Sequence, residues 1–380
     1  MNKIYLDHAA TSPVHPIVVE KMVQSMGQIY GNPSSIHSIG RDARKELDQS
    51  REILAKSIGA KEQEIILTGG GTEADNLAIF GTAYARKNEG THIITSQIEH
   101  HAVIHACHKL EKEGYDVTYL PVNKQGLISV NDVKNALRDD TILVTLMFGN
   151  NEVGTIQPIK EIGEILKNHS ATFHTDAVQA YGLIPLSVDE LQVDLLSVSS
   201  HKINGPKGIG FLFQRKGTKL FPQLFGGQQE KKRRAGTENV PATLAFAEAV
   251  KIAEQTKIEK TETFKQFKKT MVNILDNEGI QFKLNGHEQL TLPHILNISF
   301  PHTEVESLLV NLDMEGLAVS SGSACTAGSI DPSHVLVAMY GAEAEELRNS
   351  IRFSFGYGLT IEDIEQAAQK TAKVVKRLVK

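Results

Sequence analysis

The sequence predicts an α/β protein with a large domain, built on a mostly parallel, doubly wound sheet, and a smaller α+β domain. Short apolar runs typical of buried strands alternate with helical patterns through about the first 240 residues, and such alternation is typical of parallel sheets. Beyond this point a long, charged helical pattern follows and strand signals become few. The length of 380 residues is usual for two domains.

The first elements are predicted from turn-forming residues and from the helical spacing of apolar residues. Residues 1–15 are irregular, and a helix is expected from about Pro16. We expect its buried face to consist of Ile17, Val18, Met22 and Met26. A polar, turn-rich loop at 31–37 separates it from a charged amphipathic helix over 40–58.

A glycine turn then separates the first strand from the next helix. The strand at 64–68 runs into Gly69-Gly70-Gly71, and small apolar residues then recur at helical spacing. Backbone N–H groups at such a helix N-terminus bind anions, so we expect a phosphate here. The turn also matches the glycine pattern of dinucleotide-binding proteins. Such proteins need an acidic residue at the end of the next strand to hold the ribose, and here the first acid after that strand, Glu99, lies too far along the chain. We therefore do not expect a dinucleotide. Further strands are expected at 91–96, 116–121, 141–147, 171–175, 193–199 and 208–213.

The second part of the chain has a different pattern of predicted helices and strands. A helical pattern extends from Ala242 to about Asn277, followed by a short strand at 297–300, a helix near 304–316, an alternating strand at 351–355 and a final helix. We therefore assign 16–250 to the large domain, and 1–15 together with 251–380 to the small one.

Composition excludes several classes of protein. The net charge is −5 with both signs interspersed, so nothing favours direct binding to nucleic acid or to an anionic membrane. No stretch is apolar enough for a signal peptide or a transmembrane helix. The two cysteines, Cys107 and Cys325, are too few for a disulfide framework and indicate a cytoplasmic protein.

Lys202 is the first candidate catalytic residue. The apolar run 193–198 ends in Ser-Ser-His-Lys, and Gly205-Pro206 then forces a turn. Lys202 therefore lies just past the carboxyl end of a strand, where open α/β sheets bind their ligands. A lysine beside a hydroxyl and an imidazole suits an imine with an aldehyde cofactor. Taken alone, the stretch favours a solvated surface lysine, because most loop lysines are solvated.

Two more polar groups follow strands. Asp176 ends the strand at 171–175, where its carboxylate could hold the ring nitrogen of a cofactor or simply cap a turn, and Gln179 lies three residues on. His100 lies at a strand's end, from which it could face a cofactor ring. The histidines that follow it share one helical face, yet no zinc-binding pattern such as H-E-x-x-H occurs, so we expect a solvated face and no metal.

Cys325 is the candidate nucleophile. It stands in a loop of Ser, Gly, Ala and Thr at 320–329, which offers no large apolar side chains to bury it. Because structural cysteines are usually buried among such groups, this setting favours a reactive thiol.

The chain resembles the cysteine desulfurases of the NifS/IscS-like group. These enzymes belong to the class-V aminotransferase family, which is part of the fold-type I pyridoxal-phosphate enzymes. The matching motifs run in family order over essentially the whole chain. They are 5–11 (YLDHAAT), 31–35 (GNPSS), 71–77 (GTEADNL), 99–100 (EH), 150–154 (NNEVG), 174–176 (HTD), 199–202 (SSHK), 234–237 (RAGT), 320–326 (SSGSACT) and 351–354 (IRFS).

The resemblance implies a role for each candidate in holding pyridoxal 5′-phosphate. Lys202 would form the imine, Asp176 would pair with the pyridine nitrogen and Gln179 would bond the phenolic oxygen. His100 would stack on the ring and assist proton transfer. The phosphate would be held by Gly71, Thr72, Ser199 and His201, and by Thr237 of a second subunit, which implies a homodimer.

For the substrate, the resemblance implies that L-cysteine is bound by Asn32, Asn151 and Arg352, with Asn151 also next to the cofactor. Cys325 would take the sulfur as a persulfide and release L-alanine. The sulfur would pass to an acceptor protein, either an iron–sulfur scaffold or a tRNA-thiolating enzyme. Two alternatives stay open: another enzyme of this fold, such as a selenocysteine lyase or an aminotransferase, and a non-catalytic sulfur-carrier subunit.

Overall fold

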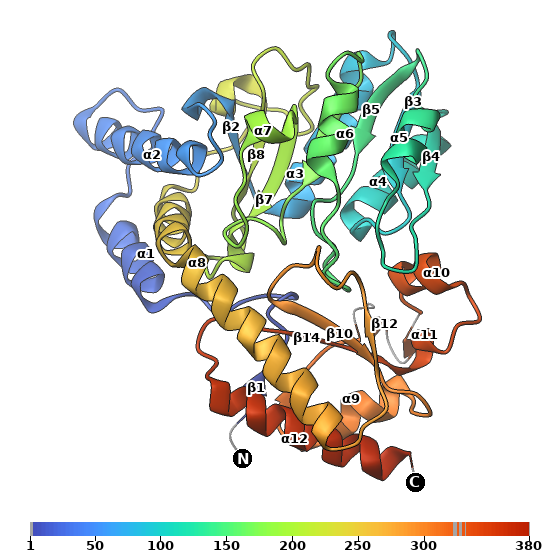
Figure 1. The fold of residues 1–380 in the computed structure, drawn as a ribbon. Helices are drawn as coiled ribbons and strands as arrows, with labels where there is room; N and C mark the ends of the chain where they lie inside the picture. Colours follow the sequence, from blue (N-terminus) through green and yellow to red (C-terminus); the bar gives the residue numbers. More distant parts are fainter. Residues whose placement is uncertain (1–2, 322–324, 327–328, 331, 380) are drawn as a thin grey trace.

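A computed structural model describes residues 3–321, 325–326, 329–330 and 332–379. Figure 1 shows a large sheet with helices on both sides in the upper half, and a smaller α/β layer below it in which both termini lie. Among the helices that the structure describes, we find none whose length and apolar content would let it span a lipid bilayer.

The main sheet has the predicted, mostly parallel character. Within the described residues it contains seven strands in the order β2-β8-β7-β6-β5-β3-β4, and only β8 runs antiparallel to its neighbours. The strands are β2 (Ile65–Thr68), β3 (His92–Ser96), β4 (Asp116–Leu120), β5 (Thr141–Thr145), β6 (Thr172–Asp176), β7 (Leu195–Ser199) and β8 (Gly210–Gln214). Each coincides within a few residues with a strand that the sequence predicts.

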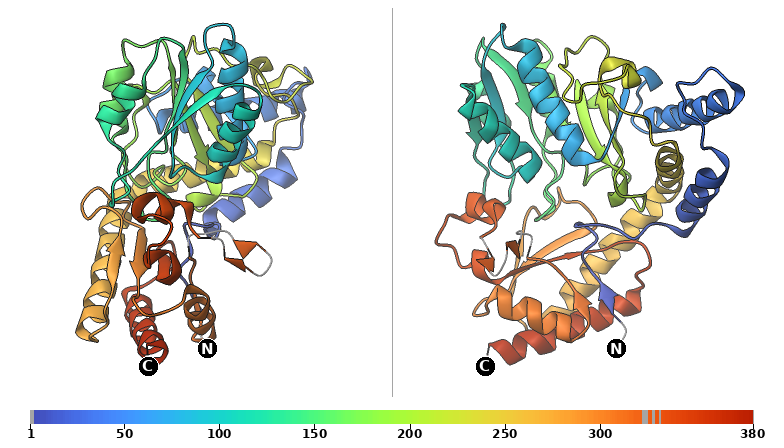
Figure 2. Two further views of the ribbon diagram at one scale, coloured as in Figure 1. Left: turned by 90° about the vertical axis from the view of Figure 1, so that its right-hand side faces the viewer. Right: turned by 180° about the vertical axis from the view of Figure 1, so that it is seen from behind.

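Helices cover both faces of this sheet. Figure 1 shows α6 and α7 in front of it, and the view from behind in Figure 2 shows α3 and α4 on the other face. The helices of this half are α1 (Pro16–Gln28), α2 (Ser38–Lys56), α3 (Gly71–Arg86), α4 (His101–Lys112), α5 (Val130–Ala136), α6 (Ile159–Leu166) and α7 (Val188–Leu191), with short 3₁₀ turns η1 (Glu62–Glu64), η2 (Ser200–Lys202) and η3 (Gln229–Lys232).

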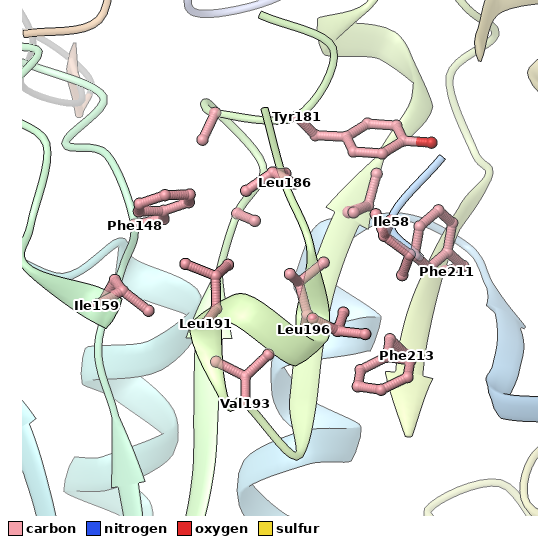
Figure 3. Close-up of a cluster of buried hydrophobic side chains, with 14 of the residues drawn as sticks. Ile58, Phe148, Ile159, Tyr181, Leu186, Leu191, Val193, Leu196, Phe211 and Phe213 are labelled. Carbon is pink, nitrogen blue, oxygen red and sulfur yellow. The ribbon is translucent and has the colours of Figure 1, made fainter. Parts of the chain in front are cut away.

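The central core lies between the sheet and its helices. Figure 3 shows Leu196 of β7 and Phe211 and Phe213 of β8 packed with Tyr181 and Leu191. All are nearly or fully buried, and each side chain of this size contributes about 1.5–3 kcal/mol when removed from water. This core holds the strand ends, and hence the groups attached to them, in place.

The smaller layer contains an antiparallel sheet in the order β14-β10-β9, and β1 pairs in parallel with β11. Its elements are β1 (Ile4–Tyr5), β9 (Lys283–Asn285), β10 (Ile295–Ser299), α9 (Val305–Met314), β11 (Leu317–Ala318), β12 (Cys325–Thr326), β13 (Ser329–Ile330), α10 (His334–Tyr340), α11 (Glu346–Asn349), β14 (Ser350–Ser354) and α12 (Ile361–Leu378). The N-terminal residues thus join the C-terminal part of the chain.

Helix α8 (Val240–Asn277) connects the two halves. Its first turns bury Phe246 and Val250 in the core of the main sheet, whereas Phe264 and Met271 belong to the core of the smaller layer. Figure 1 shows it running obliquely from one half to the other. The domain boundary proposed at residue 250 therefore falls inside a continuous helix, and the division into domains stays a prediction.

The predicted buried face of α1 is wrong at two positions. Val18 is fully buried and Met22 partly so, but Ile17 and Met26 are 51% and 62% exposed. The helix carries two apolar stripes, and only one packs against the protein. Helical spacing alone does not show which of two neighbouring stripes the core will cover.

Candidate active site

A cavity of about 290 Å³ opens at the carboxyl ends of the main sheet's parallel strands, where the fold class predicts a ligand. It brings together most of the candidate residues, from segments far apart in the sequence. Those lining it are Gly71, Thr72, His100, Asn151, Asp176, Gln179, Ser199, His201, Lys202 and Arg352.

Lys202 ends the 3₁₀ turn that follows β7 and points its amine at the N-terminal segment. Its Nζ donates to the carbonyl oxygens of Ala9 at 2.5 Å and of Ala10 at 2.8 Å. Burial, helped by the positive charge of Arg352, lowers the pKa of Lys202 to about 8. The neutral share of the amine near neutral pH is therefore far larger than that of an ordinary lysine, as an imine-forming lysine requires.

Asp176 is the last residue of β6 and is buried. One carboxylate oxygen accepts the backbone N–H of Val178 at 2.9 Å. Burial raises the pKa of Asp176 above its ordinary range. Asp75 of α3, which sequence reasoning gave no role, also lines the cavity; its carboxyl is buried, and burial and the nearby Asp176 raise its pKa.

The glycine turn lies at the edge of the cavity, where the sequence predicts an anion site. Gly70 caps α3 with a φ of 142°, and a Cβ on Gly71 would lie 2.8 Å from Val178. The turn can therefore pack against Val178 only without a side chain at position 71. The N-terminus of α3 and the side chains of Thr72, Ser199 and His201 face the same space, a donor set suited to a phosphate dianion.

His100 lies at the N-cap of α4. Its Nδ1 accepts the N–H of Ala102 at 3.1 Å, so in the neutral ring the proton is on Nε2. Desolvation inside the cavity and the nearby Lys202 lower the pKa of His100 to about 4. A neutral ring on the cavity wall is suited to stack on an aromatic ligand.

Arg352, from the middle of β14, is buried and spans the two halves of the molecule. It donates to the carbonyl oxygen of Asn151 at 2.8 Å and forms an ion pair of 2.8 Å with Asp7. Its Nε is buried and has no hydrogen-bond partner among the described residues. A guanidinium held in this way can bind a carboxylate through two donors.

Two candidates do not line this cavity, and the side chain of a third lies outside the described residues. Asn32 is exposed and accepts the N–H of Ser34 at 2.9 Å, and Thr237 is exposed on the loop before α8. The side chain of Cys325 lies outside the described part of the structure, which gives only its backbone position in β12. The roles of all three stay predictions.

Several groups that contact the site residues in the folded chain were not predicted from the sequence. Asp7 and Asp75 stand within matching motifs, so the motifs themselves could have marked them. The carbonyl oxygens of Ala9 and Ala10 carry no such signal, because every residue has one.

The chain matches the model of a known protein family over most of its length. The family model described as Aminotransferase class-V matches residues 4–367. The chain belongs to the class-V aminotransferase family. The expected fold and the resemblance to cysteine desulfurases are thereby confirmed, whereas the role of each site residue stays a proposal.

The relatives align with this chain over nearly its whole length. IscS 1 of Bacillus subtilis (strain 168) is 60% identical over 378 residues, 100% of both chains. Proteins named cysteine desulfurase IscS from Dictyoglomus turgidum and Methanosarcina thermophila are 46% and 47% identical; the alignments cover 99% of this chain in both cases and 95% and 92% of the relatives. A solved NifS-like protein superposes with a TM-score of 0.92 at 34% identity, covering 99% of this chain and 100% of its own.

Proposed function

We propose that this protein is a pyridoxal-phosphate-dependent cysteine desulfurase that converts L-cysteine to L-alanine and forms a persulfide on Cys325. The observation that carries the proposal is one cavity that unites a partly neutral lysine, Lys202, with Asp176 and Arg352. The relatives named cysteine desulfurase support the choice of reaction.

The residues present fit this cofactor. The N-terminus of α3, with Thr72, Ser199 and His201, suits its phosphate, because these groups donate hydrogen bonds and the glycine turn leaves room. Asp176 would hold the ring nitrogen and Gln179 the phenolic oxygen, with His100 against the ring. When bound, the cofactor supplies an electron sink for carbanion chemistry.

The substrate's groups match the remaining side chains. Arg352 and Asn151 would bind the carboxylate of L-cysteine, for which Arg352 must share or release its ion pair with Asp7. The neutral amine of Lys202 would then take the α-proton. The thiolate of Cys325 would form the S–S bond as the substrate's C–S bond breaks, leaving the electron pair on the carbon skeleton, which is protonated and leaves as alanine.

The test is alanine release from L-cysteine by the pyridoxal-phosphate-loaded protein, with persulfide measured in parallel. Alanine and protein persulfide in equal amounts are expected in a single turnover. Transamination would instead yield a keto acid and no persulfide, and protein that stays colourless with added cofactor would favour a non-catalytic sulfur-carrier subunit.

The lowered pKa of Lys202 leads to a prediction for the cofactor-free protein. The nucleophile is the neutral amine, so the rate of covalent capture of pyridoxal phosphate should rise with pH, about tenfold per unit, and level off above about pH 8. Stopped-flow absorbance at a series of pH values from 6 to 10 would measure this capture rate. A rate still rising at pH 10 would show that Lys202 keeps the ordinary pKa of a lysine.

The exposed apolar stripe of α1 supports a homodimer. Val19, Val23 and Met26 recur at helical spacing, with exposed fractions of 47%, 64% and 62%. A stripe of this kind on a folded chain is typical of a protein interface. We propose that a second copy of the chain covers it.

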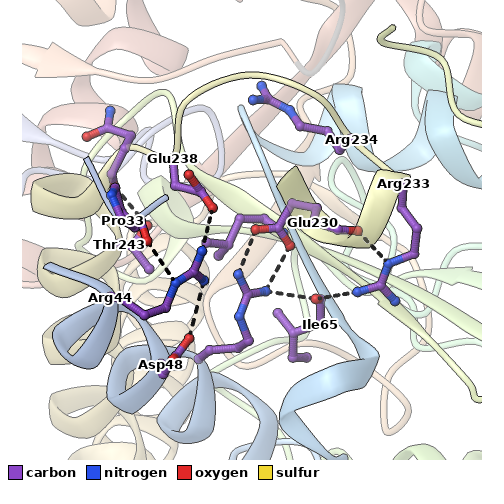
Figure 4. A network of polar contacts seen from close by, with 12 residues as sticks. Pro33, Arg44, Asp48, Ile65, Glu230, Arg233, Arg234, Glu238 and Thr243 are labelled. Atoms are coloured by element: carbon purple, nitrogen blue, oxygen red, sulfur yellow. Dashed lines mark hydrogen bonds and ion pairs between the residues drawn. The ribbon is translucent and has the colours of Figure 1, made fainter. Parts of the chain in front are cut away.

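Hydrogen bonds fix the start of the loop that carries Thr237, as a site shared between two subunits would require. Glu230 is buried and accepts two hydrogen bonds from Arg51, of 2.6 and 2.8 Å, while Arg233 donates to its carbonyl oxygen at 2.9 Å (Figure 4). Glu230 and the two lysines after it have positive φ values of 46°, 56° and 68°, which are costly for residues with side chains. This network fixes the turn from which Thr237 would reach the other subunit's phosphate.

Substituting Val23→Glu is expected to weaken the dimer at least about tenfold, since it would bury an unpaired charge at the interface. Sedimentation equilibrium would measure the dissociation constant. Val310→Glu on α9 is the matched control, because Val310 is similarly exposed at 61% but lies on another helix. If both variants stay dimeric, the interface lies elsewhere.

We further propose that the sulfur passes from Cys325 to an acceptor protein of iron–sulfur cluster assembly or tRNA thiolation in the cytoplasm. The IscS names of several relatives support this destination, and a chain with two cysteines fits a reducing compartment.

A further inference from the structure

Gln179 is the cavity residue whose orientation the structure defines most fully. Its side chain is buried and makes two hydrogen bonds: Nε2 donates to the carbonyl oxygen of Ala9 at 3.0 Å, and Oε1 lies 3.1 Å from Nε2 of His294. A carbonyl oxygen only accepts, so Ala9 requires the NH₂ end of the amide on its side. The amide oxygen must therefore face His294.

His294 has to donate in this pair. It lies directly before β10, at 6% exposure, and its Nδ1 has no partner among the described residues. Burial, with the positive charges of Lys268 and Lys202 nearby, lowers its pKa well below the ordinary value. The ring is therefore neutral, and because Oε1 of Gln179 only accepts, the single ring proton is on Nε2.

The pair leaves one N–H of Gln179 unassigned. The amide has two N–H groups; one is directed to Ala9, and Gln179 lines the cavity. The carbonyl of Ala9 also accepts the amine of Lys202 at 2.5 Å. The amide and the amine are thus held on one side of the cavity through a shared acceptor.

We propose that His294 is a positioning residue that holds the Gln179 amide so that its free N–H points to the ring oxygen of bound pyridoxal phosphate. The inference rests on the proposed function. Without the donor at position 294, the amide is held only by the carbonyl of Ala9, and its free N–H is no longer fixed in direction toward the ring oxygen.

The test is the pH titration of the bound cofactor's visible absorption. An N–H donated to the ring oxygen stabilises its negative charge, which is greatest in the deprotonated form. His294→Leu should therefore raise the midpoint by about half to one unit, the size of one neutral hydrogen bond. Gln179→Leu should raise it equally, and the double variant should show no further shift.

A matched variant separates positioning from a merely structural role. His294→Gln restores a donor of similar reach and should return the midpoint toward that of the parent, whereas His294→Leu should not. Thermal unfolding of the cofactor-free proteins shows whether each variant is folded. An unchanged midpoint in folded His294→Leu, or shifts that add in the double variant, would overturn the inference. Absence of any absorption band in the parent would instead refute the proposed function.

Discussion

Lys202→Ala is expected to abolish covalent attachment of the cofactor and to reduce alanine formation by about 100- to 10,000-fold, the usual contribution of a positioned acid–base group. Within the described residues the Lys202 side chain forms its hydrogen bonds through the amine, to two backbone carbonyls, so its loss should leave the fold intact. Borohydride reduction followed by mass spectrometry would detect the cofactor bound to the parent and its absence from the variant.

Lys268 offers a matched control. It is a second partly buried lysine, on α8, whose Nζ donates to the carbonyl oxygen of Leu292 at 2.6 Å, and desolvation lowers its pKa to about 7. A neutral amine alone would make it as good a nucleophile as Lys202, but it does not line the cavity. Lys268→Met should therefore keep the covalent cofactor. A cofactor that remains reducibly attached in Lys202→Ala would refute the assignment of Lys202.

Cys325→Ala is expected to lower persulfide formation and alanine release by at least about 1,000-fold, since it removes the proposed nucleophile. Binding of the cofactor should be unchanged, because none of the groups proposed to hold it is altered. Persulfide can be measured by alkylation and mass spectrometry after one turnover, and cofactor binding by absorbance.

The chain contains its own control for this experiment. Cys107, on α4, is fully buried, and burial raises the pKa of its thiol to about 12. It has almost no thiolate at neutral pH and cannot serve as a nucleophile. Cys107→Ala should therefore keep persulfide formation, and persulfide found on Cys107 in the Cys325→Ala variant would contradict the proposed division of roles.

Much of the fold could be predicted because its signals are local. Most strands from β2 to β8 contain a short apolar run that ends at a polar residue or glycine, as a buried parallel sheet requires, whereas β4 and β6 also carry several polar side chains. The positions of Lys202 and Asp176 followed from the same signal, since Asp176 ends β6 and Lys202 ends the short turn that follows β7. The glycine turn before α3 was recognisable because consecutive glycines separate a strand from a helix, and a Cβ on Gly71 would meet Val178 in the folded chain.

The sequence by itself determined the α/β class, the strand ends and the residue types that suit a pyridoxal-phosphate site. Only the tertiary structure decided which groups meet: Arg352 with Asp7, Lys202 with the carbonyl of Ala9, and Gln179 with His294. It also decided that Ile17 and Met26 of α1 lie outside the core. The physical reason is that strands and turns follow from neighbouring residues, whereas burial, charge pairing and lowered pKa values depend on segments that are distant in sequence and meet only when the chain packs.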